Sequence, residues 1–261
     1  MPFRKARPSV AVIRLTGVIA NGARGQLNDA ALAGAIEKAF AKGKPDAVAL
    51  VLNSPGGSPV QSSLIAARIR RLAAEKDVPV YGFVEDVAAS GGYWLACAAD
   101  EIYVDDSSIV GSIGVISASF GFHELMTRQG VERRVYTAGK DKSMLDPFRP
   151  ARDEDIDRIK DLQRQIHDAF ISHVRSRRGA KLPKGEDLFT GEIWVGAKAI
   201  EKGLVDGIGH LVPVMKDKFG DKVQFRVYGQ KKGLLSRFGA QAVETALSQV
   251  EDRAIWARYG L

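Results

Sequence analysis

The chain has 261 residues, of which 45% are hydrophobic, and its 38 basic and 31 acidic side chains give a formal net charge of +7. This length and apolar content favour one α/β domain with a full core, and no stretch reaches the roughly 18 uncharged apolar residues that a transmembrane helix needs. Cys97 is the only cysteine, so an intrachain disulfide is excluded and a cytoplasmic protein with a buried thiol is favoured.

The positive charge is scattered in short clusters, and no nucleic-acid-binding motif accompanies it. We therefore expect a solvated basic surface and no nucleic-acid partner. Peripheral contact with the inner membrane stays open, because anionic lipid attracts a basic surface.

The N-terminus has the charge pattern of a signal peptide but not its apolar core. Residues 1–7 are basic and residues 10–20 are largely apolar, yet Arg14 interrupts the apolar stretch. Ser9–Leu15 is better explained as a first strand that ends in a turn. We expect neither a signal peptide nor a transmembrane segment.

Strand-like and helix-like stretches alternate along the rest of the chain, which is typical of an α/β domain. A long amphipathic helix is predicted after Pro150, where Asp153 opens it with negative charge, and Gly179 ends it. The other predicted strands are Ala47–Leu52, Pro79–Val84, Glu101–Val104 and Arg133–Tyr136, and the other predicted helices are Asn28–Phe40, Val60–Ala74 and Gly92–Ala98.

The C-terminal part forms a separate pattern. Apolar residues from Leu234 to Ile255 follow helical spacing, with charges of both signs between them. We therefore expect an α/β domain over residues 1–227 and a C-terminal helical extension over residues 228–261. Mixed charge favours a docking or oligomer-contact helix over a membrane-surface helix.

Ser90 lies among small residues, directly before Gly91 and Gly92 and an apolar helix-like stretch. A serine at this position suits a nucleophile, because the amides at a helix N-terminus stabilise negative charge. The alternative is an ordinary helix cap, for which serine is a favoured residue.

A glycine-rich bend, Pro55–Gly57, follows the strand predicted at Ala47–Leu52. Such a bend can turn its amides outward to form half of an oxyanion hole, while the amide after a nucleophile forms the other half. An ordinary turn explains the same residues.

A nucleophilic serine needs a base. Of the four histidines, His123 is the least implausible base, and the other three suit a solvated surface. A lysine can replace histidine where burial favours the neutral amine. Lys140 and Lys142 are the lysine candidates, and the apolar Met144, Leu145 and Phe148 follow them closely.

At these residues the chain resembles the signal peptide peptidase A family of serine–lysine proteases, in a short single-copy form. The resemblance covers roughly residues 9–212. It rests on the ordered motifs Asn53–Gly57, Ala89–Gly92, Val110–Val115, Gly139–Lys142 leading to Pro147, and Gly191–Gly209.

The resemblance implies a Clp protease/crotonase-like fold of repeated β-β-α units. It gives Ser90 the role of nucleophile and Lys142, five residues before Pro147, that of general base. Ser112 matches the serine that orients the lysine, and Gly57 and Gly91 match the oxyanion-hole donors. No metal or organic cofactor is implied.

The implied activity is that of a serine endopeptidase, which hydrolyses unfolded or hydrophobic peptides such as signal-peptide remnants through an acyl-enzyme. Family members assemble into rings or domes, so we expect a homo-oligomer in which neighbouring subunits share the serine–lysine dyad. Many relatives carry an N-terminal membrane anchor, which we do not expect here. A crotonase-type acyl-CoA enzyme and an inactive scaffold of the same fold are the alternatives.

Overall fold

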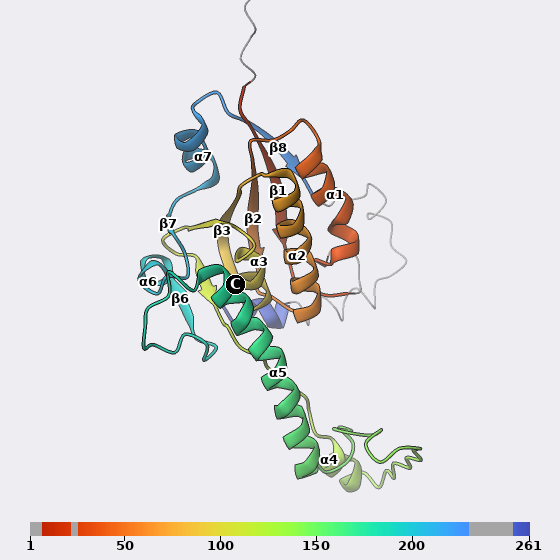
Figure 1. The fold of residues 1–261 in the computed structure, drawn as a ribbon. Coiled ribbons are helices and arrows are strands. Elements are labelled where there is room, and N and C mark those ends of the chain that lie inside the picture. Colours follow the sequence, from red (N-terminus) through yellow and green to blue (C-terminus); the bar gives the residue numbers. More distant parts are fainter. Residues whose placement is uncertain (1–6, 22–25, 230–252) are drawn as a thin grey trace, which may run out of the picture. The chain divides into compact units, whose positions relative to one another are not determined.

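The computed structural model describes residues 7–21, 26–229 and 253–261, which Figure 1 draws in colour. These residues form two compact units. The first unit takes the residues up to Ile113 and those from Phe170 onward, and the second unit is Gly114–Ala169.

A sheet of eight strands forms the centre of the first unit. Its order is β6-β5-β3-β2-β1-β8, with β4 paired to β3 and β7 paired to β4, and only the β5–β6 pairing is antiparallel. The strands are β1 Ser9–Thr16, β2 Ala47–Ser54, β3 Val80–Ala89, β4 Glu101–Val104, β5 Ile109–Gly111, β6 Ile193–Val195, β7 Gly207–Ile208 and β8 Gln224–Tyr228.

Helices connect most of these strands, as parallel pairing requires. The Asn28 side chain caps the first helix by accepting a hydrogen bond from the Ala31 amide, and a left-handed Asp77 ends the second. In the first unit the helices are α1 Asp29–Ala41, α2 Pro59–Lys76, α3 Gly91–Ala96, α6 Gly196–Glu201 and α7 Leu211–Phe219. The long helix α5, Asp153–Arg178, begins in the second unit and ends in the first.

The two faces of the sheet bury different side chains, because successive residues of a strand point to opposite sides. On β1, Ile13 and Leu15 pack into a large core with α1, α2 and α3, which cover one face (Figure 1). Val10 and Val12 pack into a smaller core with Met215 of α7 on the other face.

A buried ion pair fixes the end of α5 to the sheet. The Arg178 side chain is 1% exposed, lies 2.7 Å from Asp206 and donates two hydrogen bonds to the Gly203 carbonyl. Asp206 also accepts from the Ile102 amide of β4. A charge this deeply buried is tolerated because its partners satisfy it.

The second unit contains one short helix, α4 His123–Arg128, and the first part of α5. Asp155 is the only buried residue among its 56. Nine of its large apolar side chains are instead exposed, as for Phe120 at 78% and Tyr136 at 90%.

Most of the predicted elements are confirmed, and the expected α/β fold class is correct. The strand predicted at Arg133–Tyr136 is wrong, because that segment forms no ladder and is mostly exposed. Its alternating pattern has no partner strand in the second unit to pair with. The helical pattern of the C-terminal extension lies mostly outside the described residues, and the boundary at residue 227 stays a prediction.

Candidate active site

Ser90 follows β3 directly and stands at the N-cap position of α3. Its φ is 51° and its ψ is −122°, a strained combination for a residue with a side chain. Its amide donates to the Gly111 carbonyl at 2.8 Å, but its side chain makes no capping hydrogen bond. A serine that caps its helix would use its hydroxyl on the helix amides, so the ordinary cap does not explain this residue.

The two glycines after Ser90 are required by close packing. A Cβ on Gly92 would lie 2.4 Å from the Ser54 carbonyl oxygen, and a Cβ on Gly91 would lie 2.5 Å from the buried Ser62 hydroxyl oxygen. The helix therefore starts directly against the end of β2 and the start of α2. This contact brings the backbone around Ser90 close to the glycine bend.

The bend at Gly56 and Gly57 is more than an ordinary turn. Gly56 has a φ of 102° and Gly57 a φ of 138°, and a Cβ on Gly57 would lie 2.0 Å from the Ile19 carbonyl oxygen. The Ser54 hydroxyl accepts a hydrogen bond from the Gly56 amide at 3.2 Å, and the Ser58 amide donates one to the Ile19 carbonyl at 2.7 Å. These bonds fix the bend on both sides.

Gly57 and Gly91 meet beside Ser90, although 34 residues separate them in the chain. The Cβ position of Gly91 lies 3.3 Å from the Gly57 nitrogen, and that of Gly56 lies 2.9 Å from the Ser90 Cβ. Within the described residues, neither the Gly57 amide nor the Gly91 amide has a hydrogen-bond acceptor. A pair of amides beside a serine is the arrangement that an oxyanion hole needs.

Ser112 lies immediately after β5 and close to Ser90. Its φ is 52°, and its amide donates to the Glu192 carbonyl at 2.7 Å. Gly111, the residue before it, accepts the Ser90 amide. The structure thus brings together four of the five predicted site residues, Ser90, Ser112, Gly57 and Gly91, in the first unit.

Lys142 lies in the second unit, in the loop before α5, and is exposed there. Its neighbour Lys140 forms an ion pair with Glu154 at 3.4 Å, whereas the Lys142 amine has no partner in the part of the chain that the structure describes. The apolar surroundings that would keep a lysine neutral are therefore not supplied by the second unit itself.

The loop that carries Lys142 is nevertheless anchored. Asp141 pairs with Arg158 at 2.7 Å, and the buried Asp155 accepts the Leu145 amide at 3.4 Å. A hydrogen bond from Arg152 lowers the pKa of the Asp155 carboxyl, so the anchor stays charged. Sequence reasoning missed this anchor, and it also missed the roles of Ser54, Ser62 and Ile19 in holding the glycine bend.

Three other groups that could react, His173, His210 and Cys97, are engaged elsewhere. The His173 ring stacks on Trp94 at 4.9 Å, its Nε2 lies 3.1 Å from the Trp94 carbonyl oxygen, and burial lowers the pKa of the His173 imidazole. His210 lies 2.9 Å from Asp105. Burial raises the pKa of the Cys97 thiol to about 12, which makes it unreactive. Among the described residues, no three His, Cys, Asp or Glu side chains group as metal ligands.

Comparison with solved structures identifies the class of fold. The structure of the 1510-N membrane-bound stomatin-specific protease in complex with a substrate peptide matches with a TM-score of 0.52 and 14% identity, over 98% of this chain and 100% of that one. At this identity the match shows the fold alone, and it confirms the predicted Clp protease-like α/β architecture.

The family follows from sequence comparison. The model of peptidase family S49 matches residues 72–220, a range that includes Ser90, Gly91, Ser112 and Lys142. The chain belongs to peptidase family S49. This finding confirms the resemblance to the signal peptide peptidase A family that the ordered motifs indicated.

Relatives share this region within longer proteins. A Brucella melitensis protein named Na(+)/H(+) antiporter NhaA is 50% identical over 278 residues, which cover 99% of this chain and 38% of that protein. The chloroplastic serine protease SPPA of Arabidopsis thaliana is 30% identical over 213 residues, which cover 78% of this chain and 31% of the relative. This chain therefore spans about a third of the length of these two relatives.

Across the described ranges 7–21, 26–229 and 253–261, no helix combines the length and the hydropathy needed to span a membrane.

Proposed function

We propose that this chain is a serine endopeptidase with a serine–lysine dyad, which cleaves unfolded or hydrophobic peptides such as signal-peptide remnants. The observation that carries the proposal is the pair of Gly57 and Gly91 amides beside the strained Ser90, neither of which has an acceptor among the described residues. Family membership supports the same conclusion.

In this mechanism Ser90 Oγ attacks the carbonyl carbon of the scissile peptide bond as neutral Lys142 accepts its proton. The Gly57 and Gly91 amides then hydrogen-bond to the oxyanion of the tetrahedral intermediate. The intermediate collapses to an acyl-enzyme as protonated Lys142 gives its proton to the leaving amine. Water activated by the same lysine releases the acid product and restores Ser90.

Ser112 positions the lysine in this proposal. Its hydroxyl can hold the Lys142 amine in one orientation, because a hydroxyl both donates and accepts. Its strained backbone beside the carbonyl that binds the Ser90 amide suits such a role.

Covalent labelling tests the nucleophile. A serine-reactive phosphonate is expected to label the wild-type chain at Ser90 and to leave Ser90→Ala unlabelled. Ser176→Ala is the matched control, because Ser176 lies exposed on α5 and its hydroxyl donates a hydrogen bond to the His173 carbonyl. Labelling that persists in Ser90→Ala would remove Ser90 from the mechanism.

The same experiment separates the alternatives. A crotonase-type acyl-CoA enzyme would use the two amides on a thioester enolate and needs no nucleophilic serine, so it predicts no labelling and activity that survives Ser90→Ala. An inactive scaffold predicts neither labelling nor peptide hydrolysis. The Brucella relative is named as a Na(+)/H(+) antiporter, and that name describes its whole chain. The part that it shares with this chain includes residues 72–220, which match the peptidase family.

We further propose that the active site is completed in a homo-oligomer, in a ring or dome arrangement. The second unit supplies the supporting observation, since it exposes half of the large apolar side chains that are exposed in the described chain. They are Ile116, Phe120, Phe122, Leu125, Val131, Tyr136, Phe148, Leu162 and Ile166. Exposed apolar surface of this extent marks an interaction site.

Charge favours a protein partner for this surface over a lipid one. The second unit has ten basic and ten acidic side chains, so the whole formal charge of +7 belongs to the rest of the chain. A neutral unit gains no net attraction to anionic lipid, whereas a second copy can pair charges of both signs. Any peripheral membrane contact would use the basic remainder of the chain.

Mixing two inactive variants tests the shared site. If subunits exchange, Ser90→Ala and Lys142→Ala chains are expected to recover part of the activity when combined, because some interfaces then hold an intact serine and an intact lysine. Neither variant recovers activity when mixed with itself. Failure to recover activity in the mixture, with subunit exchange confirmed by a fluorescent label, would argue for a site within one chain.

A further inference from the structure

Strand β3 contains a bulge of two residues near its end. Leu52 of β2 pairs with Val84, but Ser54 pairs with Ala88, so β3 advances by four residues where β2 advances by two. Residues 85–86 are exposed and pair with no strand of the described sheet, and β3 changes its other neighbour here from β4 to β5. Bulges are rare between parallel strands and recur next to active sites, where they redirect a side chain.

The bulge decides where Ser90 lies along the sheet. With an unbroken register, Ser54 would pair with Asp86. Ser90 would then lie two residues, or about 7 Å, further along the sheet. In the structure, the Cβ position of Gly56 lies 2.9 Å from the Ser90 Cβ. The bulge therefore keeps Ser90 beside the glycine bend that carries the Gly57 amide.

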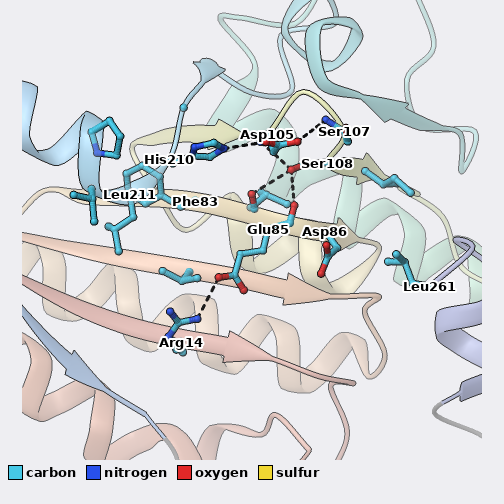
Figure 2. A pocket seen from close by; sticks show the side chains of 16 residues that line it. Arg14, Phe83, Glu85, Asp86, Asp105, Ser107, Ser108, His210, Leu211 and Leu261 are labelled. Atoms are coloured by element: carbon cyan, nitrogen blue, oxygen red, sulfur yellow. Dashed lines mark hydrogen bonds and ion pairs between the residues drawn. The ribbon is translucent and has the colours of Figure 1, made fainter.

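The Ser108 hydroxyl holds the backbone of the bulge. Ser108 is 1% exposed and lies between β4 and β5. Its hydroxyl donates to the Glu85 carbonyl at 2.5 Å and to the Val84 carbonyl at 3.2 Å, and it accepts a hydrogen bond from the Asp105 amide at 2.8 Å (Figure 2). One hydroxyl thus satisfies carbonyl groups at the point where β3 leaves β4 and the strand pairing is interrupted.

A side-chain hydrogen bond spans the bulge. The Asn53 side-chain nitrogen donates to Asp86 Oδ2 at 2.5 Å, and Asn53 lies opposite the bulge on β2. The Asn53 Oδ1 atom is buried and has no hydrogen-bond partner in the part of the chain that the structure describes. An unpaired buried acceptor lowers stability, so stability alone does not account for Asn53.

Packing does not hold the bulge on its outer side. Glu85, Asp86 and Ser108 line a pocket of about 640 Å³ on the face of the sheet that α7 covers (Figure 2). Side chains that border a cavity lack the close neighbours that fix a packed core. The hydrogen bonds of Ser108 and Asn53 are therefore the contacts that set the shape of the bulge.

We propose that Ser108, Asn53 and Asp86 are positioning residues of the serine peptidase. They hold the bulge that places Ser90 beside the Gly57 amide. This inference rests on the function proposed above, in which Ser90 attacks the peptide and the Gly57 amide stabilises the oxyanion. The three side chains act through the backbone of β3 and not on the substrate, because a small displacement of a nucleophile is enough to slow its reaction strongly.

Ser108→Ala tests the backbone contact. We expect kcat on an apolar peptide to fall by about 10- to 100-fold while KM stays within about twofold, because a misplaced nucleophile weakens the transition state and not substrate binding. A purely structural role would lower thermal stability and leave kcat per folded chain unchanged, so circular dichroism is used to measure the folded fraction. Ser107→Ala is the control, because Ser107 is the exposed neighbour, and both constants are expected to stay unchanged.

The side-chain pair gives a second test if Ser108→Ala does not fold. Asp86→Ala removes the acceptor and is expected to lower kcat by about tenfold. Asp86→Asn keeps an oxygen that accepts from Asn53, so its kcat is expected to stay within about twofold of the wild-type value. Asn53→Ala is expected to lower kcat by about tenfold with almost unchanged thermal stability, because it removes the unpaired acceptor together with the hydrogen bond.

A structural measurement separates this inference from the proposed function. In a crystal structure of Ser108→Ala or Asp86→Ala, we expect Ser90 to lie further from the Gly57 nitrogen than in the wild-type chain. If wild-type Ser90 takes no phosphonate label and no peptide is hydrolysed, the proposed function fails, and displacement of Ser90 in the variants still supports the role of the bulge. Wild-type kcat in both folded variants, or an unchanged distance from Ser90 to Gly57, would overturn the inference.

Discussion

The two units of this protein hold the proposed catalytic groups in opposite ways. The first unit surrounds Ser90, Gly57 and Gly91 with a fully packed sheet and helices, and backbone contacts fix each of the three. The second unit holds the Lys142 loop with ion pairs and exposes its apolar side chains. A packed core can fix positions within one chain, whereas an exposed apolar surface needs a partner to bury it.

This difference also assigns different chemistry to the two units. In the proposed mechanism the nucleophile and the two amides must be placed accurately at the transition state, which suits the packed first unit. The proposed base must be shielded from water to remain neutral, and only burial by another surface supplies that shielding. Assembly would then determine whether the proposed base is neutral, and it would leave the Gly57 and Gly91 amides unchanged.

The largest predicted effect tests whether the second unit is catalytic at all. Lys142→Ala is expected to lower kcat/KM on an apolar peptide by about 10⁴-fold or more, as does loss of a catalytic base in serine peptidases. Lys140→Ala is the matched control, because Lys140 is already paired with Glu154. Its kcat/KM is expected to stay within about threefold of the wild-type value, because only an exposed ion pair is lost. Full activity in Lys142→Ala would show that the second unit contributes no base.

The next largest effect on activity is expected in the first unit. In Gly57→Ala the new Cβ would lie 2.0 Å from the Ile19 carbonyl oxygen, so the bend must move and its amide with it. We expect kcat/KM to fall by about 10²- to 10³-fold, the cost of losing one oxyanion donor. Gly34→Ala is the control, since a Cβ there meets no atom within 4 Å, and in a helix it is expected to raise the free energy of unfolding by about 0.5–1 kcal/mol. If the Gly57→Ala chain keeps its activity, the Gly57 amide does not contribute to catalysis.

A third effect tests how the rigid unit holds α5. Asp206→Asn leaves the Arg178 charge buried without its partner, and we expect the free energy of unfolding to fall by about 3 kcal/mol in urea denaturation. Glu75→Gln, which breaks only an exposed pair with Arg71, is expected to change it by less than about 0.5 kcal/mol. Equal effects in the two variants would mean that Arg178 is solvated after all.

The same pair predicts a pH dependence. Burial alone would raise the pKa of the Asp206 carboxyl, but hydrogen bonds from Arg178 and Lys181 outweigh it and hold this pKa below its ordinary value of 3.8. The unfolded chain therefore binds a proton before the folded chain does as the pH falls. Stability from this pair is present above the unfolded pKa and is lost as the pH falls through the folded one. Asp206→Asn should show a weaker loss of stability in that acid range.

The smallest effect on stability is expected in the second unit. Phe120→Ser and Tyr136→Ser together should change the free energy of unfolding of the dilute chain by no more than about 0.5 kcal/mol, because both side chains are exposed. Sedimentation should nevertheless show a weaker oligomer, because the apolar contact surface is reduced. If the free energy of unfolding falls by several times that amount with no change in assembly, the second unit has an internal core and does not differ from the first unit in this respect.

Local patterns in the sequence predicted most of the first unit. The apolar run Ala47–Leu52 and the helix-like stretch Asn28–Phe40 predicted β2 and α1 within two residues, because a buried strand and a surface helix each show a local pattern of apolar residues. The same reasoning failed at Arg133–Tyr136, where a strand-like pattern has no partner strand. The position of Ser90 at the start of a short helix after a strand was also readable from the chain.

The sequence by itself therefore determined which residues are candidates for catalysis, since residue type and local spacing limit which turns, caps and strands can form. Only the tertiary structure decided that the Gly57 and Gly91 amides meet beside a strained Ser90, because sheet register and the packing of α3 against β2 bring those distant segments together. The hydrogen bond from the Tyr259 hydroxyl to Ser112 Oγ has the same origin. No local pattern relates residues 147 positions apart, and only the folded chain places them within a hydrogen bond of each other.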